Sequence, residues 1–272
     1  MFIFTTQNSI RLIKNLLLII GISITVNATA QRSEYSNVNF SAGLCGLVYL
    51  GDLTPSLYGD LNHANAGLQV AARIPLNRHL SLRGNYLTGS LNGDDDRHDG
   101  WRMKRSFGFT SNIHQVAAML QWEFAGNSWE YDEDDRYTRS YKVKKYKILS
   151  PYFFAGLGYL QNNVTRDLQG IDSVFFIGDI AWENYYKEAN TVYKSGMLVA
   201  PVGIGTHITL GSQVRLYVEY CYHAIFNDNL DGFGVAVFSA KPDAFHNLTF
   251  GLDFRFNRYG TRDRKEICNL NL

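Results

Sequence analysis

Cysteine and proline are scarce in this sequence, and so are long apolar runs. The 272 residues include three cysteines, Cys45, Cys221 and Cys268, an odd number without metal-ligand spacing. We therefore expect neither a disulfide framework nor a zinc site. Only five prolines occur. Beyond the N-terminal region, no stretch approaches the roughly 18 consecutive apolar residues of a transmembrane helix, so none is predicted.

An excess of one charge is also missing. The net charge is +1, so whole-chain electrostatics does not favour a nucleic-acid partner. The sequence contains no nucleophile elbow, no glycine-rich phosphate loop and no HExxH motif. The acidic runs at 93–100 and 129–135 lack the spacing of a calcium loop and are interpreted as solvated loops. We therefore predict no catalytic residue, cofactor, metal or small-molecule substrate. The protein is not expected to be an enzyme.

The first 30 residues have the pattern of a secretory signal peptide. Arg11 and Lys14 precede an apolar run from Leu16 to Val26, and Ala28 and Ala30 fit a small-x-small cleavage site. The run is too short to span a bilayer as a helix. Residues 1–30 are therefore predicted to be cleaved on export, and an N-terminal membrane anchor is the alternative.

Aromatic residues and glycine are abundant, and apolar residues recur at every second position. Aromatics make up 14% of the chain, with 24 glycines. This alternation predicts β-strands with one apolar and one polar face. Eight strands are predicted, at 38–50, 63–74, 80–86, 115–124, 151–160, 198–208, 214–223 and 247–256. The fifth is apolar on both faces and gives no side assignment.

Strand length and polar-face chemistry favour a barrel in lipid over a soluble sandwich. Several predicted strands reach the roughly 9–11 residues that cross a bilayer at a tilt. The polar face carries Gly, Ser, Asn and Gln with a few charges, which suits a packed polar lumen. Aromatics near the strand ends resemble interface girdles, and they are Tyr49, Trp122, Phe124, Tyr222, Phe254 and Phe256. The predicted fold is all-β, an eight-stranded antiparallel transmembrane β-barrel of the outer-membrane type.

Charged residues on the polar face predict a network inside this barrel. The six that share the phase opposite the aliphatic face are Arg83, Glu123, Arg215, Glu219, Asp253 and Arg255. Arg73 is a further counter-ion on that face, and His207 and His223 are interpreted as packed lumen residues. We expect the network to close the lumen.

Loop lengths indicate how the barrel is oriented. The long connections 51–62, 92–106, 161–195 and 227–243 are predicted to be extracellular, with short turns on the periplasmic side. Residues 125–149 are long but fall on the periplasmic side. Either a hairpin extends strands four and five there or the strand count is wrong. The predicted barrel covers 31–258, and a basic tail covers 259–272.

Five segments of the chain follow one another in the order "GLCGLVYLGDL", "LNRHLSLRGNYLTGSLNGDD", "RSFGFTSNIHQVAAMLQWEF", "PYFFAGLGYL" and "VEYCYHAIFNDNLDG". They resemble PorG-like outer-membrane barrels, which are small OmpA-type barrels associated with type IX secretion and gliding. The resemblance implies an anchoring component in the outer membrane of a Gram-negative bacterium. It also implies periplasmic secretion-ring or lipoprotein partners beside the lipids. A small channel and a ligand-binding or adhesion barrel unrelated to secretion are the alternatives.

The segment 125–149 is the candidate surface for such a partner. It joins an acidic-aromatic run to a basic-aromatic one, and aromatic residues are enriched at interface hot spots. The candidate residues are Trp129, Tyr131, Asp132, Tyr141, Lys144 and Tyr146. The basic tail Arg262–Lys265 is expected to contribute, and a merely solvated hairpin is the alternative.

Overall fold

The computed structural model describes most of one compact unit, Asn37–Leu272. The described residues are 38–51, 53–54, 58–61, 64–95, 104, 106–127, 130–132, 144–146, 148–168, 183, 187, 190–191, 195–210, 213–227, 230–233 and 243–255. The predicted signal peptide, the C-terminal tail, Trp129, Tyr141 and Phe256 lie outside them. No helix among the described residues is long and apolar enough to cross a membrane.

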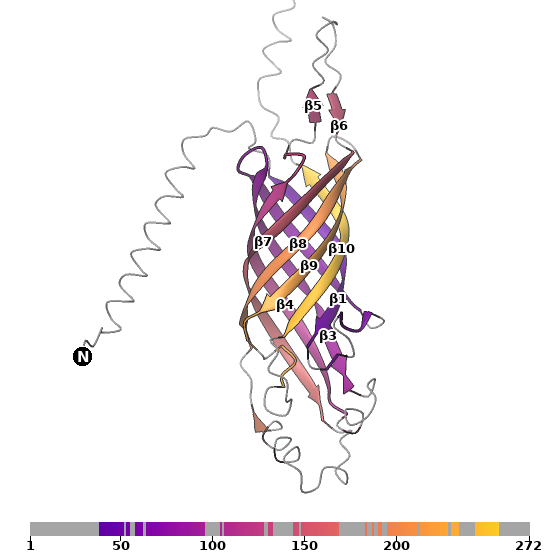
Figure 1. Ribbon diagram of the computed structural model, residues 1–272, viewed down its shortest axis with the longest axis vertical. Coiled ribbons are helices and arrows are strands. Elements are labelled where there is room, and N and C mark those ends of the chain that lie inside the picture. The colour runs from indigo at the N-terminus through magenta and orange to yellow at the C-terminus, as the bar shows by residue number, and fades with distance from the viewer. Residues whose placement is uncertain are drawn as a thin grey trace, which may run out of the picture. The chain divides into compact units, whose positions relative to one another are not determined.

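Eight long strands close into one antiparallel barrel (Figure 1). They are β1 (Asn39–Leu50), β2 (Asn65–Pro75), β3 (Leu80–Asp94), β4 (Gly108–Glu123), β7 (Leu149–Asp167), β8 (Met197–Thr209), β9 (Val214–Ile225) and β10 (Ala244–Arg255). Their order around the barrel is β1-β10-β9-β8-β7-β4-β3-β2, and β1 closes it by pairing with both β10 and β2. The predicted fold class is confirmed.

Two short strands form a separate hairpin between β4 and β7. In this sheet β5 (Glu130–Asp132) pairs antiparallel with β6 (Lys144–Tyr146). The strand ends that lead into the hairpin, Glu123 and Leu149, lie at the same barrel end as the tight turns β2–β3 and β8–β9. The segment 125–149 therefore contains a hairpin, and the barrel keeps eight strands.

Side chains alternate between the inside and the outside of the barrel over most of each strand, although Leu47, Val48 and Tyr49 near the end of β1 are all buried. In β4 every second residue is buried, from Phe109 to Glu123, while Val116 and Leu120 on the other face are exposed. Across the other strands the exposed set is also apolar and includes Leu44, Leu68 and Phe250, each more than half exposed. Exposing such side chains to water would be unfavourable, whereas hydrocarbon accepts them. The outer surface is thus a lipid-facing belt.

Strand β7 is longer than the sequence predicted and also has a defined inner face. Tyr152 and Phe154 point inward, while Phe153 and Leu157 are exposed. The strand continues to Asp167, so the predicted loop 161–195 begins too early. Beyond Leu160 both faces carry polar residues, so alternation of hydrophobicity gives no signal there. The predicted loop 92–106 likewise overlaps the end of β3 at Asp94.

Tyr49 is a second correction, because it does not belong to the outer aromatic girdle. Its side chain is buried inside the barrel end. Its hydroxyl oxygen lies 2.8 Å from a carboxylate oxygen of Asp231 and 2.8 Å from one of Asp243. The other predicted girdle aromatics that are described are exposed on the outer surface, and they are Trp122, Phe124, Tyr222 and Phe254.

Candidate functional site

Six charged side chains meet inside the half of the barrel nearer the tight turns. They come from five strands and are Arg73, Arg83, Glu123, Arg215, Glu219 and Asp253. Each lies at an inward position of its strand, and each is at most 4% exposed. We call these six residues the ionic layer. It contains three positive and three negative side chains, so the layer is balanced in formal charge.

Arg83 and Glu219 form a two-pronged ion pair. Arg83 Nη1 donates to Glu219 Oε2 at 2.5 Å, and Nη2 donates to Oε1 at 3.0 Å. Tyr152 and Gln69 also donate to Glu219, each at 2.9 Å. The Arg83 guanidinium lies 5.0 Å from the centre of the Phe154 ring, in a cation–π contact. Four donated hydrogen bonds thus satisfy a carboxylate that no bulk water reaches.

The remaining four members of the ionic layer are linked in one chain. Arg73 donates to Glu123 at 2.6 Å and to Asp253 at 2.8 Å. Arg215 donates to the same Asp253 oxygen at 2.5 Å, and its Nη1 lies 3.9 Å from Glu123. His207 is beside them, with its ring stacked on Tyr152 at 4.4 Å. Each of the four thus has two partners of opposite charge, and removing any one member would leave a buried net charge of one unit.

The ionic layer leaves almost no free space. The cavity among Arg73, Arg83, Glu219, Asp253 and their neighbours has a volume of about 10 Å³. This is about the volume that a single water molecule requires. Among the described residues, the space at the centre of the layer therefore has room for about one water molecule.

Five of the six residues predicted for the lumen lie in this layer. The sixth, Arg255, is the last residue of β10 and is half-buried, with its backbone N–H donating to Gln213 at 2.9 Å. Arg73 takes a central place, although it was not among the predicted six. The alternation of residues in the sequence of β2 predicts that the Arg73 side chain points inward. It does not predict that Arg73 lies at the same level of the barrel as Glu123 and Asp253.

The other half of the lumen contains a large cluster of apolar side chains, which the sequence analysis did not predict, with buried polar residues such as Ser111, Gln115 and Asn162 beside it. Its inward side chains include Leu47, Leu87, Leu91, Ile113, Leu160 and Phe245, all fully buried. Loop residues join them, since Phe107 stacks on Phe233 with ring centres 5.0 Å apart. We call this cluster the apolar plug. The plug fills the barrel end near the long connections, and both strands and loops contribute apolar side chains to it.

Hydrogen bonds hold the loop part of the plug in place. Asp243 accepts from the backbone of Leu230 at 2.9 Å, and Asp231 accepts from the backbone of Phe233 at 2.9 Å. Arg166 on β7 donates to the Gly232 carbonyl at 3.3 Å. The described part of the lumen is thus sealed twice, by charges at one end and by apolar packing at the other.

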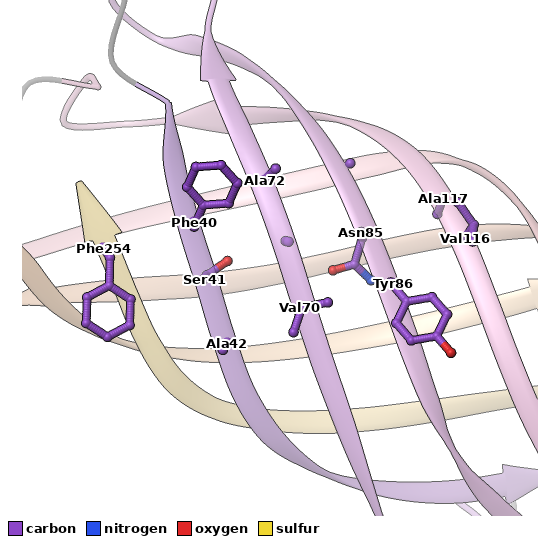
Figure 2. A pocket seen from close by; sticks show the side chains of 12 residues that line it. Phe40, Ser41, Ala42, Val70, Ala72, Asn85, Tyr86, Val116, Ala117 and Phe254 are labelled. Atoms are coloured by element: carbon purple, nitrogen blue, oxygen red, sulfur yellow. The ribbon is translucent and has the colours of Figure 1, made fainter. Parts of the chain in front are cut away.

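A shallow hollow lies on the outer surface over β1, β2 and β3 (Figure 2). Its floor is made of small residues, among them Ala42, Ala72 and Gly84, and its volume is about 580 Å³. Phe40 and Phe254 stand at one side and Tyr86 at the other (Figure 2). A methyl group added at Gly84 would meet no atom within 4 Å. The hollow belongs to the lipid-facing belt.

The candidate partner residues are only partly described. In the hairpin, Glu130 is paired with Tyr146, Tyr131 with Lys145 and Asp132 with Lys144. The register therefore sets an acidic strand beside a basic one. Among the described residues, no group of three or more His, Cys, Asp or Glu side chains could hold a metal ion.

A closed barrel with an apolar exterior and a packed ionic interior is a transmembrane β-barrel of the outer-membrane type. In such proteins the tight turns face the periplasm and the long connections face the outside of the cell. This orientation puts the ionic layer in the periplasmic half and the apolar plug in the extracellular half.

Solved outer-membrane proteins are similar to this chain. Neisserial surface protein A has 16% identity and a TM-score of 0.42, over 80% of this chain and 97% of its own. Ail, the attachment invasion locus protein of Yersinia pestis, has 9% identity and a TM-score of 0.40, over 81% and 99%. OprG from Pseudomonas aeruginosa has 11% identity and a TM-score of 0.39, over 82% and 96%. No family model and no curated protein matches the chain.

Proposed function

We propose that this protein is a non-enzymatic, non-conducting outer-membrane anchor that works through the surfaces it fixes at the membrane. The observation that carries the proposal is the doubly sealed lumen. A balanced ionic layer with about 10 Å³ of free space offers no route for a solute. This argues against a small channel, the main alternative raised by the fold.

The hairpin β5–β6 supplies the second part of the argument. Barrels of this type usually join strands by tight turns on the periplasmic side. The connections 76–79 and 210–213 follow that rule, whereas 125–149 does not. A long hairpin at one periplasmic connection could serve as a docking surface for a periplasmic partner.

The assembly we propose is a type IX protein secretion or gliding apparatus. This part rests on the resemblance of the sequence segments to PorG-like barrels. The proposed partner is a periplasmic ring protein or lipoprotein of that apparatus. It would contact the hairpin residues Trp129, Tyr131, Asp132, Tyr141, Lys144 and Tyr146.

Deletion of the hairpin tests this proposal. The deletion should remove 130–146 and keep Asn127, because the Asn127 side chain donates to the carbonyls of Asn77 at 2.6 Å and Leu80 at 3.1 Å. It should also keep Ile148, whose carbonyl accepts from Thr209 at 3.0 Å. The barrel is then expected to insert normally, since none of its eight strands is changed.

Two measurements read the result. Affinity purification from membranes after cross-linking compares the periplasmic proteins captured by the wild type and by the deletion variant. The medium is assayed for type IX cargo in cells that carry only the variant. We expect both the captured partner and the secreted cargo to be lost. An inserted barrel that keeps both would overturn the docking site, and intact secretion in cells without the protein would overturn the type IX role.

A further inference from the structure

Three neighbouring strands extend beyond the rest of the barrel on the extracellular side (Figure 1). β3, β4 and β7 have 15, 16 and 19 residues, whereas the other barrel strands have 11 to 13. The ladder between β2 and β3 ends at Gly89, and the ladder between β7 and β8 ends at Leu160. Past these points β3, β4 and β7 continue as a three-stranded sheet.

The outer face of this sheet carries polar, hydrogen-bonding side chains over three successive rows. The rows follow the strand register and are Thr88–His114–Gln161, Ser90–Asn112–Asn163 and Asn92–Thr110–Thr165. We call these nine residues the polar wall. They cover roughly 14 Å along each strand, at about 3.4 Å per residue. No Lys, Arg, Asp or Glu is among them.

The polar wall is one-sided. On β8 the outward residue Leu198, which is 63% exposed, pairs with Tyr159 in the row beneath the wall, and on β2 the outward residue Leu68, which is 56% exposed, pairs with Thr88. The neighbouring outward residue of β2, Ala66, is also exposed. The polar face therefore occupies the three strands that extend furthest and borders an apolar side chain of the lipid-facing belt on β2.

The polar wall follows directly on the lipid-facing belt. The row beneath it is Tyr86–Val116–Tyr159, in which Tyr159 is 54% exposed. Tyrosines at this place mark the boundary between hydrocarbon and headgroups. The hydroxyls of Tyr86 and Thr88 each lie 3.0 Å from His114 Nδ1. The wall thus begins at headgroup level and rises from there.

Most of the wall's hydrogen-bonding capacity is unused. The side chains of Ser90, Thr110, Asn112, Gln161, Asn163 and Thr165 have no partner within the described part of the chain. Asn92 is the exception in the upper row, since its side-chain oxygen accepts from Asn65 at 2.8 Å. An Asn side chain has two donors and one acceptor oxygen. Asn112 and Asn163 therefore present two adjacent, unoccupied amides at the centre of the wall.

The inner face of the same sheet is fixed. Leu91, Ile113 and Leu160 are fully buried in the apolar plug. The donors and acceptors of the outer face are therefore held by a rigid sheet. Preorganised groups bind more tightly because less conformational freedom is lost on binding.

We propose that the polar wall binds the uncharged sugar headgroup of a glycolipid in the outer leaflet. Its continuity with the lipid-facing belt means that a ligand on the wall can keep its acyl chains in the bilayer. Amides and hydroxyls match the mixed donor and acceptor pattern of sugar hydroxyls. A phosphate would call for Arg or Lys, which the wall lacks. The inference is independent of the proposed secretion role.

Native mass spectrometry of the full barrel provides the test. The purified protein is placed in micelles with equal amounts of digalactosyldiacylglycerol, whose headgroup is two neutral sugars, and phosphatidylglycerol, whose headgroup is anionic. The lipids that remain bound after detergent removal are counted. We expect the wild type to retain the galactolipid in preference to the phospholipid.

The test variant is Asn112→Ala with Asn163→Ala, and the matched control is Gln213→Ala in an exposed periplasmic turn. Loss of two amides should weaken galactolipid binding by about tenfold or more, and the control should bind as the wild type does. Migration of unheated samples in gels checks folding. If the double variant does not fold, the two single variants carry the test. No preference in the wild type, or undiminished binding by a folded variant, would overturn the proposal, as would a preference for the anionic lipid.

Discussion

Arg83 and Glu219 form an ion pair across the full width of the barrel, although 136 residues separate them in the sequence. Their strands, β3 and β9, are four places apart in the closed order of eight strands and so lie on opposite sides. The pair therefore connects opposite walls through the lumen. Both partners are nearly inaccessible to water, at 3% and 2% exposure.

Breaking this pair should destabilise the barrel strongly. Glu219→Met and Arg83→Met each leave one buried charge without its partner, which typically costs about 3–5 kcal/mol. The double variant Arg83→Met with Glu219→Met removes both charges, so it should cost clearly less than the sum of the two single changes. Equilibrium unfolding in urea with the barrel in lipid vesicles measures both. Additive effects of the two single changes would contradict the pairing.

The sealed lumen predicts an absence of conductance. The protein, reconstituted in planar bilayers, should show no steady openings, because the ionic layer and the apolar plug block the path in series. A well-behaved porin inserted in the same bilayer provides the positive control. Steady openings on the nanosiemens scale would contradict the closed lumen.

The sequence determines the faces of most strands because lipid requires an apolar side chain at every outward position. In β2, for example, Leu68 and Val70 alternate with Gln69 and Arg73, and this phase is the one observed. The rule fails in β7, where Phe153 and Phe154 are both aromatic and only the closed barrel decides which one points inward.

The contacts inside the lumen could not be predicted in the same way. Alternation assigns a residue to the inner face but does not give its height, which depends on the register of all eight strands. Arg73 reaches Glu123 and Asp253 only because of that register. The apolar plug was missed for a related reason. We expected polar residues at all inward positions, but Leu47 and Leu87 point inward. Leu53 and Leu230, which lie in loops, pack with them.

Charged substitutions in the lipid-facing belt should destabilise the barrel. Leu68, Leu120, Val218 and Phe250 all have outward phase in the barrel. An Arg substitution at Leu120, Val218 or Phe250 should cost about 2–4 kcal/mol of barrel stability, as it does near the bilayer midplane of other barrels, and Leu68→Arg should cost less because Leu68 pairs with Thr88 near the headgroups. Unfolding of the vesicle-inserted protein measures the cost. Leu61→Arg, in the extracellular connection, is the control and should be nearly neutral. Equal tolerance at belt and loop positions would contradict the assigned depth.

Two glycines with opposite surroundings give the last prediction. Gly84 forms part of the floor of the outer hollow, and an added Cβ would meet nothing within 4 Å. Gly251 faces the lumen, and its added Cβ would lie 2.3 Å from the Ala42 carbonyl oxygen and 2.6 Å from the Gly43 Cα. Both of these atoms belong to the backbone of β1, so they cannot yield without shifting the strand that closes the barrel.

Gly84→Ala should therefore leave the unfolding free energy unchanged or raise it slightly, because the unfolded chain loses freedom while the folded site stays unstrained. Gly251→Ala should destabilise by about 1–3 kcal/mol, the usual range for overpacking, or prevent assembly. Unfolding in urea and the fraction of folded barrel after refolding into vesicles compare the two variants directly. Equal stability of Gly84→Ala and Gly251→Ala would show that the close approach of β1 and β10 at Gly43 and Gly251 does not limit the packing of the lumen.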